Sequence, residues 1–325
     1  MKKILQVIKS NKLMSGITLF LLFAISLSVV VNFYVSIRDE IITIQHFVAD
    51  DTLEDGRGQK VKVILLNGQS NASGVGSVYY LQEKSEATDY LRYEAGYDNV
   101  LINFFSENGN YSSQGAFVRA KVGQGCTPDY IGPELGLADA LSQNYEDELI
   151  FILKYTWGGS TLHTDWRAPS MSGQTGELYT AFINFTTTNM DYLRGKNYDA
   201  SIEAMCWMQG ESDAYLPHSN NYEEGLRSFI SDLRGDLDEY AGDAGIYFID
   251  AGIYDSPLID EHEAINAAKQ SVASQSSKNH YFDTIAAGLE YDKEPLDNPD
   301  LAHFDALSTL QLGQLFANEF INIYS

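Results

Sequence analysis

The chain has 325 residues, of which 44% are apolar and 20% are charged. This composition supplies enough apolar side chains for a folded core and argues against intrinsic disorder. The formal net charge of −24 repels nucleic acid and anionic lipid headgroups, so we expect no nucleic-acid partner. A neutral substrate is not repelled in this way, and strong acidity also keeps a protein soluble in a salty medium.

The N-terminal part of the chain is typical of a membrane anchor followed by a linker. Residues 16–35 contain no charged side chain and are about as long as a helix needs to cross a bilayer. Four lysines precede this segment, and the positive-inside tendency places the N-terminus in the cytoplasm. We therefore expect a cytoplasmic tail (1–15), a single-pass transmembrane helix (16–36), a linker (37–60) and one extracytoplasmic domain (61–325). Secretion after cleavage of a signal peptide is the alternative.

Beyond residue 60, apolar strand-like runs alternate with amphipathic helix-like runs. The predicted strands are 61–66, 148–156, 201–208, 245–252 and 280–285. The predicted helices are 133–145, 179–194, 221–238, 262–276 and 306–322. This alternation predicts the α/β class, with a parallel sheet covered by helices on both faces. The stretch 72–132 has mixed polarity, and we interpret it as an insertion beside the site with local strands or turns.

Ligands of open parallel sheets bind at the carboxyl ends of the strands, so the residues that follow each strand are the candidates for chemistry. Ser70 follows the first predicted strand, within Gly68-Gln69-Ser70-Asn71. A serine at the start of a helix or tight loop on this rim suits an acyl-transfer nucleophile. The alternative is an ordinary helix N-cap.

The next two strands are followed by residues that suit stabilisation of an oxyanion. Gly159 lies after the second strand, where a glycine N–H can donate to a substrate oxygen, or simply form a turn. Gln209 and Glu211 lie after the third strand. Gln209 can donate to an oxyanion, and Glu211 can hold another residue in place or act as an acid. A hydrogen-bonded loop is the alternative for both.

An acid and a histidine lie three residues apart, just before the last predicted helix. The carboxylate of Asp300 can fix the tautomer of His303 while the other ring nitrogen faces Ser70. Without Ser70, a solvated loop histidine would be the simpler interpretation. Together, these positions place a nucleophile, oxyanion donors and a base at one edge of a sheet, as an acyl hydrolase requires.

The two cysteines, Cys126 and Cys206, are not part of a CxxC pair or of any zinc-binding spacing, so we expect no metal site. Outside the cytoplasm they can form one disulfide. Alternatively, Cys206 is a buried strand residue that acts as a small apolar side chain.

Five segments, in this order, resemble the SGNH hydrolase superfamily: GQSN (68–71), GPELG (132–136), KYTWGGSTL (154–162), WMQGESDA (207–214) and DLAHFD (300–305). The chain is most similar to the carbohydrate esterase branch, which contains the sialate O-acetylesterase-like and acetylxylan esterase-like enzymes. The resemblance covers about residues 61–322. It implies a three-layer α/β/α fold with a flavodoxin-like parallel sheet, and hydrolysis of an acetylated carbohydrate without metal or other cofactor.

The resemblance also implies roles for individual residues. Ser70 matches the nucleophile, His303 the base and Asp300 the acid that orients it, with Glu211 as the rival for that last role. The Ser70 N–H, Gly159 and Gln209 match the oxyanion-hole positions. The superfamily's usual asparagine block is not evident, and Gln209 stands in its place, which leaves the donor set open.

Several alternatives remain open at the level of sequence. The acyl donor can differ, as in a lipase-like or thioesterase-like SGNH enzyme, or the domain can be an inactive glycan-binding module. The sequence does not name the sugar. From their place near the motifs, we expect the 72–132 insertion, the segment 163–166 and Tyr179 to shape a sugar pocket, with Trp166 as the residue to test.

Overall fold

The computed structural model describes residues 53–106, 111–215, 217–295 and 298–325. The predicted cytoplasmic tail and transmembrane segment, and most of the predicted linker, lie outside these ranges. Within the described ranges, no helix is both long and apolar enough to cross a membrane.

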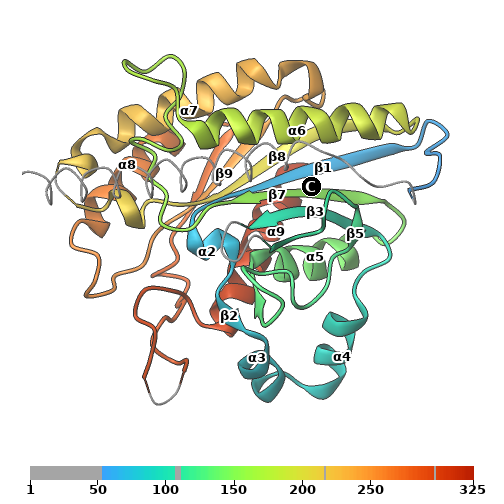
Figure 1. Ribbon diagram of the computed structural model, residues 1–325, viewed down its shortest axis with the longest axis horizontal. Helices are drawn as coiled ribbons and strands as arrows, with labels where there is room; N and C mark the ends of the chain where they lie inside the picture. The colour runs from blue at the N-terminus through green and yellow to red at the C-terminus, as the bar shows by residue number, and fades with distance from the viewer. Residues whose placement is uncertain (1–52, 107–110, 216, 296–297) are drawn as a thin grey trace, which may run out of the picture. The chain divides into compact units, whose positions relative to one another are not determined.

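The centre of the domain is a mostly parallel sheet (Figure 1). Its parallel strands are β1 (Lys60–Gly68), β3 (Val100–Ser106), β7 (Ile150–Thr156), β8 (Asp199–Met208), β9 (Tyr247–Ala251) and β10 (Asn279–Phe282). They lie side by side in the order β10-β9-β8-β1-β7-β3. Without β3, the other five strands follow the order 2-1-3-4-5 in chain sequence, which is the flavodoxin-like order.

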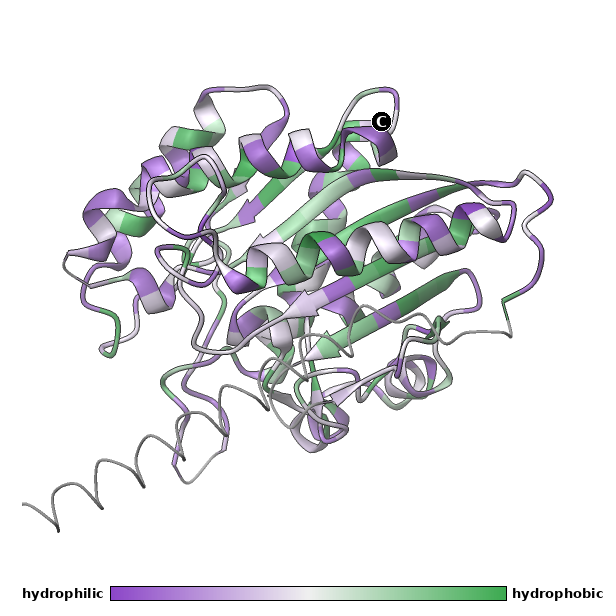
Figure 2. Cartoon of the chain, turned by 45° about the horizontal axis from the view of Figure 1, so that its top comes forward, coloured by the Kyte–Doolittle hydropathy of each residue, from purple (hydrophilic) through white to green (hydrophobic). Residues whose placement is uncertain are grey.

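Five long helices accompany the sheet: α5 (Pro133–Asn144), α6 (Glu177–Gly195), α7 (Tyr222–Asp236), α8 (His262–Ser274) and α9 (Ala306–Tyr324). Figure 1 shows α6 and α7 on one face and α5 and α9 on the other. Apolar residues concentrate along the central strands, whereas the surrounding helices alternate apolar and polar residues (Figure 2). The predicted parallel sheet with helices on both faces is confirmed, and each predicted element lies within three residues of an observed one.

The insertion contains more regular structure than its mixed polarity suggests. Its strand β3 pairs in parallel with β7 and extends the sheet by one position. Two short strands, β4 (Tyr111–Ser112) and β5 (Val118–Arg119), pair antiparallel with β3. The insertion also contains the helices α3 (Val78–Lys84) and α4 (Ala87–Ala95), and a small separate sheet of β2 (Gly76–Ser77) and β6 (Tyr130–Ile131).

The two cysteines do not form a disulfide. Cys126 and Cys206 are free thiols, and both are buried. Burial raises the pKa of both thiols, because it disfavours the charged thiolate. They therefore act as small apolar residues, which the sequence offered as the alternative for Cys206.

Candidate active site

Ser70 begins a short helix directly after the central strand β1. The helix α2 (Ser70–Ser73) starts where the end of β1 passes close to the end of β8. Gly68 has a φ of +143°, and a Cβ there would lie 1.9 Å from the Met208 carbonyl oxygen, so only glycine fits. This close approach turns the chain sharply and leaves Ser70 about 8% exposed at the sheet edge.

The rims of several strands enclose one cleft of about 430 Å³ at this edge. Ser70 and His303 both line it. Gly159 and Glu211 also line it, from the segments after β7 and β8. Tyr254, after β9, contributes an aromatic wall. The sequence analysis expected the candidate residues to gather at this edge. Ser70, Gly159, Glu211 and His303 do line the cleft, whereas Asp300 and Gln209 do not.

Asp300 contacts the imidazole of His303 from the side away from this cleft. The distance from His303 Nδ1 to Asp300 Oδ2 is 2.7 Å. A carboxylate in this position accepts the Nδ1 proton, which leaves Nε2 free to accept another. The second oxygen, Asp300 Oδ1, accepts the backbone N–H of Ala302 at 2.8 Å, so the carboxylate itself is fixed.

The loop that carries His303 is braced by the segment after β9. The Ser256 hydroxyl donates to the Leu301 carbonyl at 2.6 Å, and the Tyr254 hydroxyl contacts the carbonyl of Ala302. The ring of Tyr254 also lies 4.9 Å from that of Phe304. These contacts fix the backbone before His303 and the side chain of the residue after it.

Asn71 links the serine helix to the histidine loop, a role that the sequence analysis missed. Its Oδ1 accepts the Phe304 N–H at 3.0 Å, and its Nδ2 donates to Glu211 Oε1 at 2.6 Å. Glu211 makes no hydrogen bond to His303 among the described residues. Burial raises the pKa of Glu211, although the Asn71 hydrogen bond partly opposes that rise. The only sequence signal for Asn71 was its place directly after Ser70.

Gln209 is wholly buried and does not line the cleft. Its Nε2 has three protein acceptors: Asp213 Oδ2 at 2.6 Å, Ser160 O at 3.1 Å and Gln69 Oε1 at 3.3 Å. An amide nitrogen carries only two hydrogens, so none remains for a substrate oxygen. The geometry thus opposes the interpretation of Gln209 as an oxyanion donor and shows it joining two loops.

Two backbone N–H groups remain as candidate donors. Gly159 is exposed on the cleft with a φ of +66°, and nothing lies within 4 Å of a Cβ placed there. The N–H of Ser70 is the first of α2 and has no acceptor within the helix. Among the described residues, no hydrogen bond occupies either group.

A family model described as "carbohydrate esterase, sialic acid-specific acetylesterase" matches residues 60–322. The chain belongs to this family. The resemblance to the carbohydrate esterase branch of the SGNH hydrolases is therefore confirmed. No curated protein sequence matches the chain.

Three solved structures are similar to this carbohydrate esterase. A protein from Arabidopsis thaliana is 19% identical with a TM-score of 0.57, covering 80% of this chain and 98% of that chain. NanS is 15% identical with a TM-score of 0.57, over 82% and 98%. A carbohydrate acetylesterase from Xanthomonas citri is 14% identical with a TM-score of 0.52, over 79% and 55%. At these identities the likeness shows the fold.

A buried ion pair supports the serine helix of this carbohydrate esterase from below. Lys154 Nζ, on β7, donates to Glu134 Oε2 at 2.7 Å and to the carbonyl oxygens of Ser73 and Gln124 at 2.8 and 2.9 Å. The other oxygen of Glu134 accepts the Gly132 N–H at 2.7 Å. The pair thus joins the end of α2 to the start of α5 and leaves each charged group with several partners.

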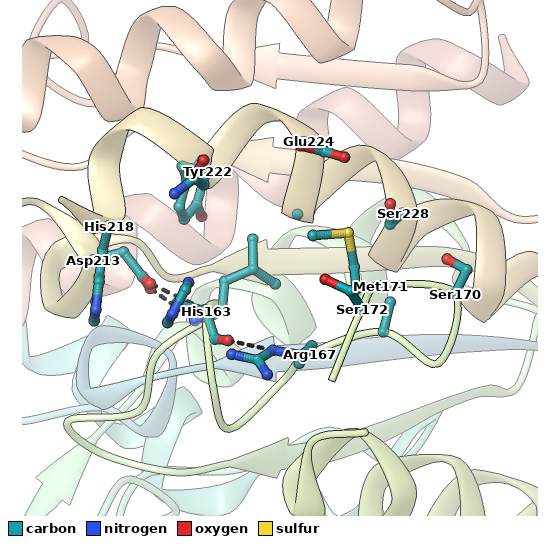
Figure 3. Close-up of a pocket in the computed structure, with 14 residues that line it drawn as sticks. His163, Arg167, Ser170, Met171, Ser172, Asp213, His218, Tyr222, Glu224 and Ser228 are labelled. Carbon is teal, nitrogen blue, oxygen red and sulfur yellow. Dashed lines mark hydrogen bonds between the residues drawn. The ribbon is translucent and has the colours of Figure 1, made fainter. Parts of the chain in front are cut away.

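A second cavity, of about 420 Å³, lies beside α7 (Figure 3). The rings of His163 and His218 stack there with their centroids 4.2 Å apart. Asp213 accepts the backbone N–H of His163, and Arg167 donates to the His163 carbonyl at 2.7 Å. Burial, reinforced by the neighbouring His218, lowers the pKa of His163.

Trp166 and Tyr179 do not shape a sugar pocket, contrary to the expectation from the sequence. Trp166 is 0% exposed and packs edge-on against Trp207, with a centroid distance of 5.3 Å. Tyr179 is 2% exposed and packs against Phe229. Both belong to the aromatic core between the sheet and α7. Of the expected segment 163–166, His163 lines the second cavity.

Proposed function

We propose that this carbohydrate esterase removes acetyl groups from sugars through a serine acyl-enzyme mechanism, with Ser70 as nucleophile and His303 as base. The observation that carries the proposal is that both residues line one cleft, while the far nitrogen of the imidazole contacts Asp300 at 2.7 Å. A nucleophile, a base and an orienting acid are the parts that such a mechanism needs. The SGNH hydrolase fold, with its helices in layers on both faces of a flavodoxin-like sheet, is part of the same proposal.

The first half of the reaction forms an acetyl-enzyme. His303 Nε2 takes the Ser70 hydroxyl proton as Oγ attacks the acetyl carbonyl. The N–H groups of Ser70 and Gly159 receive the negative charge that develops on the carbonyl oxygen. The C–O bond to the sugar then breaks, and the imidazolium returns its proton to the leaving sugar oxygen. No step requires a metal or other cofactor.

The second half releases acetate. A water molecule loses its proton to His303 Nε2 while its oxygen attacks the acetyl carbonyl. The bond to Ser70 Oγ breaks and the serine regains its proton from the imidazolium. Asp300 stabilises this imidazolium in both halves and is our choice for the orienting acid. Glu211 acts as a positioning residue, because its Oε1 accepts a hydrogen bond from Asn71 Nδ2.

The direct test of the acyl group is a chain-length series. We expect the full-length chain in detergent to cleave p-nitrophenyl acetate and acetylated glycans, and to lose activity steeply with butyryl and octanoyl esters. A preference for long acyl chains or thioesters would instead indicate a lipase-like or thioesterase-like SGNH enzyme. A folded protein that binds acetylated glycans but cleaves no ester would be a binding module.

We also propose that residues 16–36 anchor the chain in a membrane, with the domain from residue 61 outside the cytoplasm. The supporting observations are the uncharged run over 16–35 and the four lysines before it. Expression of the full-length chain, alkaline extraction of the membranes and protease treatment of intact cells test this. Recovery of a shortened chain in the medium would show a cleaved signal peptide instead.

A further inference from the structure

A cleft of about 330 Å³ adjoins the Ser70 cleft on the opposite side of His303. His303 lines both clefts, whereas Asp300 lines this cleft and not the Ser70 cleft. In the proposed mechanism, the leaving oxygen of the sugar must reach the Nε2 atom of His303. Because the two clefts share His303, the sugar that carries this oxygen can extend past the imidazole into this cleft.

Three tyrosines form the wall of this cleft, and the insertion supplies all of them. Tyr79 and Tyr80 lie on α3, and Tyr130 lies on β6. In the small sheet, Tyr130 pairs with Ser77, whose hydroxyl caps α3, so one short unit carries the three rings. Tyr79 is 71% exposed. Exposed rings that combine an apolar face with a polar tip are typical of binding surfaces rather than of a core.

A buried carboxyl group at the cleft lacks one of its partners. Glu294 is about 9% exposed, and its Oε1 accepts the Ser77 N–H at 2.8 Å. Its Oε2 is buried without a hydrogen bond among the described residues. Leaving a buried polar atom unsatisfied is costly, and such atoms call for an explanation. Because this atom is buried, a sugar hydroxyl in the cleft would reach it only when the Glu294 side chain turns toward the cleft.

The ionisable groups that line this cleft are mostly carboxyl groups. Glu83, Glu294 and Asp300 line it, and none of its lining residues is a lysine or arginine. Two lysines adjoin lining residues in the chain, and both are paired: Lys84 with Glu83 at 2.8 Å, and Lys293 with Asp292 at 2.8 Å and Glu290 at 3.3 Å. Burial raises the pKa of Tyr80, and the negative charge of Asp305 raises it further. The cavity beside α7 differs from this cleft, because a cationic side chain, that of Arg167, lines it.

We propose that the cleft walled by Tyr79, Tyr80 and Tyr130 holds the sugar of the ester and selects a neutral acetylated saccharide over an acetylated sialic acid. The tyrosine faces cover the apolar face of a sugar ring, and the Glu294 carboxyl, which lines the cleft, turns to accept a sugar hydroxyl. A sugar carboxylate would meet like charges without a free cation, which disfavours it. This inference rests on the proposed function, and it identifies the substrate class of that same site.

The test compares three esters on the full-length chain: O-acetylated xylo-oligosaccharides, O-acetylated N-acetylneuraminic acid and p-nitrophenyl acetate. We expect kcat/KM for the xylo-oligosaccharides to exceed that for the sialic acid by at least about tenfold. Tyr79→Ala should lower kcat/KM for the xylo-oligosaccharides, mainly through KM, by a factor at least about five times larger than for p-nitrophenyl acetate. Glu83→Lys should raise kcat/KM for the sialic acid relative to the neutral glycan.

The matched control is Leu91→Ala. Leu91 is a 61% exposed apolar residue on α4, the helix that follows α3, and it lines none of the three cavities described above. It should match wild type on all three esters.

Four results would overturn the inference: a wild type that prefers the sialic acid, no relative gain on the sialic acid in Glu83→Lys, equal losses on all esters in Tyr79→Ala, or a glycan-selective loss in Arg167→Ala. A glycan-selective loss in Arg167→Ala would place the sugar in the cavity beside α7. Failure of folded wild type to cleave any of the esters, p-nitrophenyl acetate included, would instead contradict the proposed function itself.

Discussion

Replacement of Asp300 by asparagine separates the two candidates for the orienting acid. The side chains of Asp300 and His303 are 40% and 25% exposed, so solvent partly screens their interaction. Two unit charges about 4 Å apart interact by about 1 kcal/mol in water and about 4 kcal/mol at an effective dielectric constant near 20. We therefore expect Asp300→Asn to lower kcat by roughly fivefold to a thousandfold, since about 1.4 kcal/mol corresponds to tenfold.

Glu211→Gln is the matched comparison. Glutamine keeps an acceptor for Asn71 Nδ2, and the raised pKa of Glu211 means that burial already disfavours its charged form. We expect a smaller loss than in Asp300→Asn. The assay is steady-state hydrolysis of p-nitrophenyl acetate at low and high salt, with circular dichroism to confirm folding. High salt should reduce the difference in kcat between wild type and Asp300→Asn, because salt screens the charge interaction that the variant removes. A larger loss in Glu211→Gln than in Asp300→Asn would refute the reasoning.

Three further predictions concern the groups around the site. Lys154→Met should destabilise the fold by about 3–5 kcal/mol in urea unfolding, because it leaves Glu134 charged and unpaired in the core. The double variant Lys154→Met/Glu134→Leu should recover part of this loss of stability. Equal stability of the single and double variants would contradict this prediction. Burial raises the pKa of Glu294 to about 7. The folded state therefore binds the Glu294 proton more tightly than the unfolded state does. As a result, the wild type loses stability as the pH rises from about 4.5 to about 7. Glu294→Gln should therefore gain Tm relative to wild type between about pH 5 and about pH 8, and a parallel pH dependence would count against this. Asn71→Ala removes the hydrogen bonds to Glu211 and Phe304. It should lower the free energy of unfolding by roughly 1–3 kcal/mol for each partner left unsatisfied, and it should also lower kcat. An unchanged Tm would argue against the link between the two loops.

The regular elements of the domain were predictable because local signals mark them. Continuous apolar runs predicted the central strands, and Pro133 opens α5 as expected for a first-turn proline. Asp305 caps α9 by accepting the Ser308 N–H, close to the predicted helix start. The strand β3 escaped prediction, because Asn103 interrupts its apolar run. In the structure, Asn103 hydrogen-bonds Asn189 and Ser113 within the core, which makes a polar residue tolerable there.

The candidate site was predictable only in part, since the sequence does not say which way a polar side chain points. Ser70, Gly159 and His303 line one cleft, as their places after successive strands implied. Gln209 occupies a similar place, yet its amide turns inward to Asp213. The partnership of Ser77 with Glu294 joins residues 217 positions apart, so no local pattern indicated it.

The most direct test of the central claim identifies the nucleophile among the serines of the cleft. Ser212 also lines it and serves as the matched control for Ser70. The full-length chain, Ser70→Ala and Ser212→Ala would each be treated with a fluorophosphonate, and the modified peptide identified by mass spectrometry alongside acetate release. We expect the label on Ser70 alone, retained in Ser212→Ala, and a fall in activity of at least about a thousandfold in Ser70→Ala only. Full activity in Ser70→Ala, or a label on Ser212 in the wild type, would contradict the serine mechanism proposed for this carbohydrate esterase.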